Sequence, residues 1–211
     1  MDIESPATVR TQIVASSSAQ EGGAEIERRA ALRQRAVYRV AHVHARDDDG
    51  LARVLNISDE GVGLKLHIPV MLGDMVTVQL AERVTFVGRV VWTCGADCGL
   101  RLEDPIDSEA LLKELAVQAN SKAQRALRIA VDKPAVARSE AGLRRIQVQD
   151  VSQYGMKIQH DGSFAEGLRV KVTMQSGTER RGVVRWSRDG IAGLMLLEPF
   201  SASELGSTKN L

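Results

Sequence analysis

Two arginines and a polar turn stand near each other in the first half of the sequence. Arg35 and Arg39 are separated by three residues, and Asn56, Ser58 and Gly61 follow within the hexapeptide Asn-Ile-Ser-Asp-Glu-Gly. A planar guanidinium group binds phosphate through two parallel hydrogen bonds, while amide and hydroxyl groups supply further donors and acceptors. Glycine permits a positive φ and a close approach to the backbone. These residue types suit ligand binding, although arginines alone would indicate only a solvated surface.

The polar turn occurs twice in the chain. Asp150, Ser152 and Gly155 repeat it as Asp-Val-Ser-Gln-Tyr-Gly, so that a shift of 94 residues carries Asn56 onto Asp150. Among the pairs of identical residues that the same ungapped shift relates are Ser58 and Ser152, Gly61 and Gly155, Gly73 and Gly167, Gly88 and Gly182, Trp92 and Trp186, Gly99 and Gly193, and Pro105 and Pro199. Self-similarity at one fixed offset predicts a tandem duplication.

Upstream of the turn, the two copies are predicted to lose this register. The stretch 134–142 resembles a lengthened hairpin loop, and allowing for about five extra residues there matches Arg39 to Arg128. Arg35 then corresponds to Gln124, so the second copy lacks one arginine. We therefore expect a degenerate second site at Arg128, Asp150, Ser152 and Gly155.

The strand pattern predicts an all-β protein with short strands. Tyr38 to Ala45 is expected to be extended, and the acidic stretch from Asp47 to Gly50 is expected to form the following turn. In the returning strand, 51–58, period-two alternation places Asn56 and Ser58 on the same face as two small apolar residues. Val62, Leu64, Leu66 and Ile68 then alternate with smaller or polar residues, which is typical of a half-buried strand.

The predicted organisation is two small domains joined by a helix. Residues 1–25 form a flexible tail, 26–105 the first domain with its arginine-rich arm, 106–121 a connecting helix, 122–200 the second domain, and 201–211 a C-terminal tail. The helix is predicted because Asp107 or Ser108 can cap it and because leucines recur at helical spacing.

Composition narrows the function classes. Of 211 residues, 44% are apolar, which is enough for one or two cores, and the 28 basic residues nearly balance the 27 acidic ones. Aromatic residues make up only 3%, which disfavours a stacking platform for single-stranded nucleic acid. No apolar run is long enough to span a membrane and the first residues do not resemble a secretory signal, so we expect a cytoplasmic protein with no membrane insertion.

Other reactive residue types have ordinary structural interpretations. Cys94 and Cys98 lack the further ligands of a zinc site and are expected to be reduced thiols on a hairpin. His42 and His44 share a strand face without an evident third ligand, so we expect exposed histidines and no metal. No arrangement of a nucleophile and its base, paired carboxylates or a phosphate-binding glycine loop is present. The sequence therefore does not indicate an enzyme.

The first copy resembles the PilZ domain family. Arg35-Ala36-Val37-Tyr38-Arg39 is similar to the family's R-x3-R motif, and the turn ending at Gly61 is similar to its [D/N]-x-S-x-x-G motif. The sequence Val90-Val91-Trp92, followed by Gly99-Leu100-Arg101-Leu102, is similar to its closing strands. The resemblance implies two tandem six-stranded antiparallel β-barrels and a receptor for the bacterial second messenger cyclic di-GMP.

The resemblance also implies a role for each residue of the motifs. Arg35 and Arg39 would bind phosphate or guanine edges, Asn56 the guanine Watson–Crick edge, and Ser58 a phosphate or its own turn, while Gly61 would permit close approach. Gln34 occupies a position that in the family affects how many ligand molecules stack. Trp92 is either a core residue or, as the family's tryptophan near the site suggests, a ligand contact.

Two other functions remain open from sequence. Both barrels can be ligand-independent interaction modules whose arginines dock an acidic protein, and the arm from Arg28 to Arg39 can bind nucleic acid weakly. We favour a cyclic di-GMP receptor without nucleic-acid binding, which acts on a downstream protein effector or through a homo-oligomer.

Overall fold

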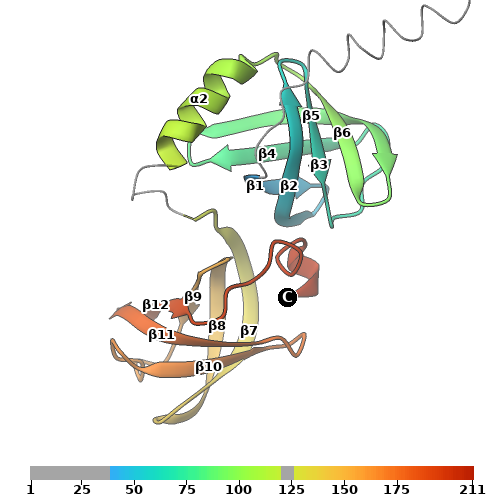
Figure 1. Cartoon of the computed structure of the whole chain (residues 1–211). Coiled ribbons are helices and arrows are strands. Elements are labelled where there is room, and N and C mark those ends of the chain that lie inside the picture. The colour runs from blue at the N-terminus through green and yellow to red at the C-terminus, as the bar shows by residue number, and fades with distance from the viewer. Residues whose placement is uncertain (1–38, 120–125) are drawn as a thin grey trace, which may run out of the picture. The chain divides into compact units, whose positions relative to one another are not determined.

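A computed structural model describes residues 39–119 and 126–211, so Gln34, Arg35 and the predicted tail at 1–25 lie outside the described residues. The strands form two closed antiparallel barrels, in the orders β1-β2-β3-β6-β5-β4 and β10-β11-β12-β9-β8-β7 (Figure 1). The prediction of two six-stranded barrels with a helix between them is confirmed.

The strands of the first barrel are β1 (Arg39–Ala45), β2 (Asp48–Ser58), β3 (Gly61–Lys65), β4 (Met75–Ala81), β5 (Val84–Cys94) and β6 (Asp97–Leu102). The second barrel contains β7 (Ile129–Ser139), β8 (Gly142–Ser152), β9 (Gly155–Gln159), β10 (Arg169–Met174), β11 (Glu179–Arg188) and β12 (Ile191–Leu196). Helix α2 (Ser108–Ala119) follows β6, and a short 3-10 helix, η1 (Thr208–Asn210), ends the chain.

Alternation along the strands fills each barrel with apolar side chains. In β3, Val62 and Leu64 are buried in the core of the first barrel, while Gly61, Gly63 and Lys65 belong to the outward-facing row. This agrees with the half-buried strand predicted from sequence. Closed barrels leave no strand edge unpaired, so both copies can be short and still satisfy their backbone groups.

A bulge in β2 changes which face carries the polar motif. The ladder with β3 is irregular between Val54 and Asn56, where Leu55 is the additional residue. Val54 and Ile57 are both buried, whereas Asn56 and Ser58 are partly exposed. The prediction that Asn56 and Ser58 share a face with Val54 was therefore wrong, because an extra residue in a strand reverses the alternation after it.

The first hairpin turns earlier than predicted. Ala45 pairs with Asp48, so the turn consists of Arg46 and Asp47, and Arg46 has a φ of 57°. Asp48, Asp49 and Gly50, which were predicted as the turn, instead begin β2. The cross-strand partners of Asp48 to Gly50 therefore belong to β1, and of the residues predicted as the turn only Asp47 lies in it.

The corresponding hairpin of the second barrel has an equally short turn. Ser139 pairs with Gly142, so the longer loop predicted at 134–142 was wrong. Arg39 pairs with Val54, and the same ladder position in the second barrel joins Lys133 to Val148. Arg39 therefore corresponds to Lys133, not to Arg128. The irregularity lies further upstream, at a bulge between Ala130 and Lys133.

The segment 201–211, predicted as a tail, is packed against protein. Leu205 and Leu211 are buried, and the Leu205 carbonyl accepts a hydrogen bond from the Leu51 amide at 2.7 Å. Asp48 is buried and accepts hydrogen bonds from the hydroxyls of Ser207 and Thr208, at 2.5 and 2.7 Å. These hydroxyls satisfy a carboxylate that would otherwise be costly to bury.

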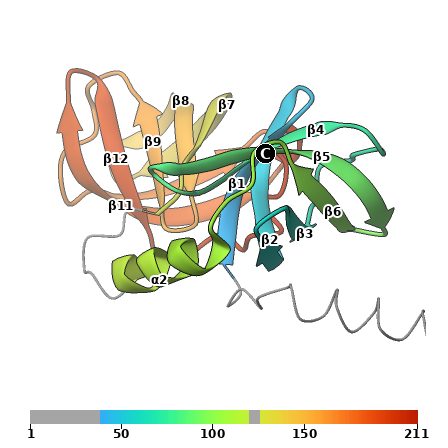
Figure 2. The ribbon, with the colours of Figure 1, turned by 90° about the horizontal axis from the view of Figure 1, so that it is seen from above.

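Helix α2 lies beside the first barrel in both views (Figure 1, Figure 2). Leu115 is fully buried in the core of that barrel, with Leu111 and Leu112 packed partly buried beside it. The N-terminus is capped locally, since Asp107 accepts a hydrogen bond from the Ala110 amide at 2.9 Å. The connecting helix predicted over 106–121 is thus a structural part of the first barrel.

Candidate ligand-binding site

Four residues of neighbouring strands form a row across the outside of the first barrel. Asn56 pairs with Gly63, Gly63 with Gly99, and Gly99 with Trp92. A Cβ atom on Gly63 would come within 2.8 Å of Asn56 Nδ2, and one on Gly99 within 1.9 Å of Trp92 Nε1. The amide and the indole therefore lie flat over the two glycines. We call Asn56, Gly63, Gly99 and Trp92 the amide–indole row.

Trp92 belongs to this outer surface. Trp92 is 36% exposed, so the alternative in which it is a core residue was wrong. The bulge in β5 between Val90 and Trp92 accounts for this, because it turns the strand outward after the buried Val90. An accessible indole face is consequently available to stack on a flat ligand.

A second row runs beside the first. Ser58 pairs with Gly61, Gly61 with Arg101, and Arg101 with Arg89, and both arginines are exposed. The Arg89 guanidinium donates a hydrogen bond to the Gly73 carbonyl at 3.0 Å. We call Ser58, Gly61, Arg101 and Arg89 the basic row. Its two guanidinium groups place positive charge next to the polar turn.

The polar turn is closed by its own hydroxyl. Ser58 Oγ donates a hydrogen bond to the Gly61 carbonyl at 3.2 Å. Gly61 does not adopt the positive φ that a glycine permits. A Cβ atom at this position would lie 2.9 Å from the Leu100 carbonyl oxygen. Glycine is therefore required by the close approach of β6.

The turn also holds helix α2. Asp59 Oδ1 accepts hydrogen bonds from the Ser108 hydroxyl at 2.6 Å and from the Ser108 amide at 3.1 Å. The hydroxyl and then the amide of Ser108 keep the pKa of Asp59 below its ordinary value of 3.8. The Asp59 carbonyl accepts a further bond from the Ile106 amide at 2.9 Å.

Arg39 contacts the same helix further along. Its Nη2 donates a hydrogen bond to the Leu115 carbonyl at 2.5 Å. By strand alternation, Arg39 belongs to the row of Ala41 and Val43, which are fully buried. The structure therefore does not bring Arg39 onto the outer face that carries Asn56 and Ser58.

The second barrel keeps the turn and changes its surroundings. Ser152 Oγ donates to the Gly155 carbonyl at 3.3 Å, as Ser58 does in the first barrel. Lys157 stands where the first barrel has Gly63, between Asp150 and Gly193 in the ladder. The positions of Arg101 and Arg89 are held by Met195 and Val183. A lysine thus interrupts the amide–indole row, and apolar residues replace both arginines of the basic row.

Arg128, the arginine predicted for the second site, is already paired. Arg128 forms an ion pair with Asp150, and its guanidinium lies 3.7 Å from the position of a Cβ atom on Gly155. The structure therefore brings Arg128, Asp150 and Gly155 together. The carboxylate of Asp150 already satisfies an arginine, whereas the neutral amide of Asn56 has no charge to pair with one.

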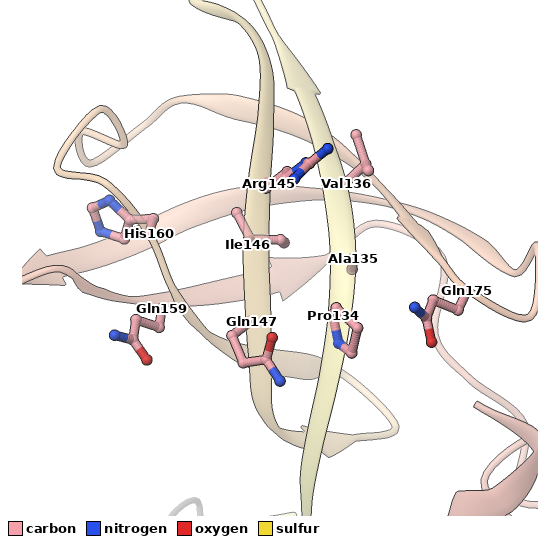
Figure 3. A pocket seen from close by; sticks show the side chains of 9 residues that line it. All are labelled: Pro134, Ala135, Val136, Arg145, Ile146, Gln147, Gln159, His160 and Gln175. Atoms are coloured by element: carbon pink, nitrogen blue, oxygen red, sulfur yellow. The ribbon is translucent and has the colours of Figure 1, made fainter.

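A groove elsewhere on the second barrel has another character. It has a volume of about 720 Å³ and is lined by side chains of β7, β8, the end of β9 and Gln175. The labelled side chains are spread along the strands and do not converge on one point (Figure 3). His160 is engaged with Ser187 and with the Gly162 amide, and Gln147 donates to Asp132. No residue of either polar turn lines this groove.

The histidines and cysteines have structural roles. His42 Nε2 lies 2.9 Å from Asp49 Oδ1, and His44 Nδ1 lies 3.2 Å from Asp49 Oδ2, so the two rings share one carboxylate. Across 39–119 and 126–211, no cluster of three or more potential ligands could hold a metal ion. Cys94 and Cys98 are free thiols, as predicted, the first exposed and the second buried.

No helix within residues 39–119 and 126–211 is long and apolar enough to cross a membrane.

Comparison with known proteins decides the family. The model of the PilZ domain matches the chain twice, over residues 27–118 and 121–204. The chain belongs to the PilZ domain family. No curated protein matches its sequence.

Similar solved structures include three named proteins. PlzA of Borreliella burgdorferi in complex with c-di-GMP is 10% identical, with a TM-score of 0.35, and the match covers 81% of this chain and 84% of that one. YcgR of Escherichia coli in complex with c-di-GMP is 11% identical, with a TM-score of 0.28 and coverage of 85% and 80%. The MrkH–c-di-GMP complex of K. pneumonia is 9% identical, with a TM-score of 0.29 and coverage of 85% and 84%.

The PilZ motif does not include every residue that the structure places at the candidate site. Arg101 and Arg89 were not predicted, yet the ladder places Arg101 beside Gly61 and Arg89 beside Arg101. A signal was present in the sequence: the shift that relates the two PilZ copies carries Arg101 onto Met195 and Arg89 onto Val183. Positions where duplicated domains differ in charge are informative when only one copy is expected to bind.

Proposed function

We propose that this PilZ protein is a non-enzymatic, cytoplasmic receptor for cyclic di-GMP and that the first barrel binds the ligand. One observation carries the proposal. The outer face of the first barrel combines the Asn56 amide, the closed Ser58–Gly61 turn and two exposed arginines in adjacent rows. At the positions of Gly63 and Arg101 the second barrel has Lys157 and Met195, and Asp150, the counterpart of Asn56, is already paired with Arg128.

The chemistry of this face complements a cyclic guanine dinucleotide. Asn56 can accept through its amide oxygen from the guanine Watson–Crick edge, and the exposed indole of Trp92 can stack on a base. Ser58 has committed its hydroxyl hydrogen to Gly61, so toward a ligand its oxygen acts as an acceptor. Arg35 and Arg39 supply guanidinium groups for phosphate or for guanine O6 and N7, and Gln34 flanks them.

Signal transmission in this proposal uses the arginine arm. Ligand binding draws Arg35 and Arg39 toward the barrel face, which changes the surface that a downstream effector meets. Arg39 contributes to this change because it is held by the Leu115 carbonyl without ligand. The second barrel does not bind the nucleotide and instead contacts an effector or a second copy of the chain.

Isothermal titration with cyclic di-GMP tests the proposal. We expect saturable binding that is lost in the Arg35→Ala, Arg39→Ala double variant and strongly reduced by Asn56→Ala. The matched control is Arg128→Ala with Asp150→Ala, which alters the second turn and should leave affinity unchanged. Cyclic di-AMP, which lacks the guanine O6 acceptor, should bind more weakly. Absence of heat with the wild type, or equal affinity in the double variant, would refute the receptor assignment.

Weak nucleic-acid binding by the arginine arm is distinguished by salt. Such a complex would weaken steeply as salt increases and would tolerate the loss of Asn56 or Ser58. A nucleotide site on the barrel requires both side chains. Titration of the wild type and of Ser58→Ala at two salt concentrations therefore separates the two possibilities.

A ligand-independent adaptor is the second candidate, favoured by the apolar surface of the second barrel. Tyr154, Trp186, Met195 and Leu197 remain 39% to 60% exposed around the second turn. Exposed apolar groups of this kind are typical of protein interaction surfaces. Light scattering of the wild type and of Met195→Glu, each with and without cyclic di-GMP, tests for a homo-oligomer. An adaptor predicts association that does not respond to the nucleotide.

A further inference from the structure

The basic row of the first barrel and the equivalent row of the second barrel differ in charge, although their backbone ladders are the same. Gly61 pairs with Arg101 and Arg101 with Arg89, while Gly155 pairs with Met195 and Met195 with Val183. The two positions therefore have equivalent places relative to the two turns. A barrel of this fold evidently needs no arginine at either position for its stability.

Arg101 is also available to a ligand. Its side chain is exposed and points outward from β6, next to a glycine that leaves the neighbouring backbone uncovered. Within the described residues, no hydrogen bond or ion pair engages its guanidinium group. Arg89, one strand further, is partly restrained by its bond to the Gly73 carbonyl. Two guanidinium groups on adjacent strands can hold one phosphate between them.

We propose that Arg101, with Arg89 beside it, binds a phosphate of the nucleotide and explains why only the first barrel binds. This inference rests on the proposed function. The basic row then holds the ligand on the barrel surface. A phosphate here lies next to the Ser58–Gly61 turn, so that the nucleotide spans the basic row and the amide–indole row.

The test compares arginine substitutions on and off this row. Arg101→Met takes the residue found at the equivalent position of the second barrel, so the variant should fold, which a thermal melt verifies. We expect affinity for cyclic di-GMP to fall at least about tenfold, because a charge-assisted pair is lost, and to fall further with Arg89→Val added. Arg83→Met, in the exposed turn between β4 and β5, is the matched control. If Arg101→Met and Arg83→Met bind equally well, the phosphate subsite is refuted while the receptor function stands. A wild type that does not bind refutes both.

A second observation concerns helix α2, which is held at two points by residues of the ligand motifs. Asp59, inside the polar turn, binds the Ser108 amide and hydroxyl at the start of the helix. Arg39, the second arginine of the arm, donates to the Leu115 carbonyl in the second half of the helix. The Leu115 side chain is also fully buried in the barrel core, so packing anchors the helix at this second contact as well.

We infer that α2 reports the occupancy of the ligand site, which also rests on the proposed function. Arg39 cannot point its guanidinium group both at the Leu115 carbonyl and at a bound nucleotide on the outer face. Ligand binding therefore costs α2 a contact in its second half, where a positive charge stabilises the helix dipole. The Asp59 contact keeps the first turn in place, so the response is confined to the end of α2 that leads toward the second barrel.

Coupling of this kind is reciprocal, and this makes it testable away from the site. Val117 is 73% exposed on α2 and belongs to neither row. Val117→Ala favours the helix and Val117→Gly disfavours it, so the glycine variant should release Arg39 more readily. We expect Val117→Gly to bind cyclic di-GMP more tightly than Val117→Ala, by up to about fivefold.

Hydrogen exchange of α2 provides the direct measurement. In the wild type, saturating cyclic di-GMP should speed exchange of amides 112–119 by about two- to fivefold, while amides of the first turn stay unchanged. Arg39→Ala without ligand should show the same faster exchange, and Arg83→Ala should not. Binding by calorimetry without any change in the exchange of α2 refutes the coupling and leaves the receptor assignment intact. Equal affinity of the two Val117 variants for cyclic di-GMP would likewise refute the coupling and leave the receptor assignment intact.

Discussion

Lys157 occupies in the second barrel the ladder position that Gly63 occupies in the first. Gly63 lies between Asn56 and Gly99, and Lys157 lies between Asp150 and Gly193. A glycine leaves the outer face open for the Asn56 amide, which lies directly over it. A lysine side chain fills that space and adds a positive charge near the paired Asp150.

Gly63→Lys should therefore abolish nucleotide binding without unfolding the protein. The new side chain displaces Asn56, a flexible side chain, and the second barrel shows that the fold accepts lysine here. We expect affinity to fall at least about a hundredfold, close to 3 kcal/mol, in a titration, with a small change in melting temperature. Lys157→Gly is the control and should keep wild-type affinity. Retained tight binding in Gly63→Lys would show that the ligand lies elsewhere.

Gly61→Ala should destabilise the first barrel and weaken the ligand site together. The added Cβ atom would lie 2.9 Å from the Leu100 carbonyl oxygen, which belongs to the backbone and cannot move aside cheaply. We expect a loss of about 1–3 kcal/mol in the free energy of unfolding by urea. Gly155→Ala provides a close match, because its Cβ atom would lie 2.9 Å from the Leu194 carbonyl oxygen. That variant should lose comparable stability and keep its ligand affinity.

Cys94 and Cys98 should differ sharply in reactivity. Burial, with a smaller contribution from the neighbouring Asp97 carboxylate, raises the pKa of the Cys98 thiol to about 11. The thiolate is the reactive form, so iodoacetamide at neutral pH should label exposed Cys94 in the native protein and leave Cys98 unlabelled. Mass spectrometry after labelling in urea should find both modified. Equal labelling of both thiols in the native state would contradict the burial of Cys98.

Acidification should loosen the start of α2 before the barrels unfold. The pKa of folded Asp59 lies below its ordinary value of 3.8, because Ser108 donates two hydrogen bonds to it. This contribution to stability is present above the unfolded value and is lost as pH falls through the folded one. Hydrogen exchange of residues 108–111, corrected for its intrinsic pH dependence, should therefore increase below about pH 4. Asp59→Asn should show the faster exchange already at neutral pH.

The bulges explain most of the difference between prediction and structure. Alternation in β3 was predicted correctly because Gly61 to Lys65 contains no interruption. The face of Asn56 was predicted wrongly, since nothing in the local pattern marks Leu55 as an extra residue. Trp92 follows a comparable irregularity after Val90. A bulge depends on how two strands fit each other, so one strand's pattern cannot reveal it.

The alignment of the two copies upstream of the turn failed for a related reason. Arg39 and Arg128 have similar sequence neighbours, but Arg39 shares its ladder position with Lys133. The stretch 134–142 contains turn-forming residues and still forms most of a regular hairpin. Cross-strand hydrogen bonds determined the register there.

The sequence by itself determined the duplication, the all-β class, the connecting helix and the polar turns, because identities at one shift and alternation within a strand are local or repeated signals. Only the tertiary structure decided which side chains share a face with those turns. Arg101 lies beside Gly61 because β6 pairs with β3. Arg39 of β1 contacts Leu115 of α2 because that helix packs on the first barrel. Both contacts join residues far apart in the chain, and the geometry of a closed barrel sets which of them meet.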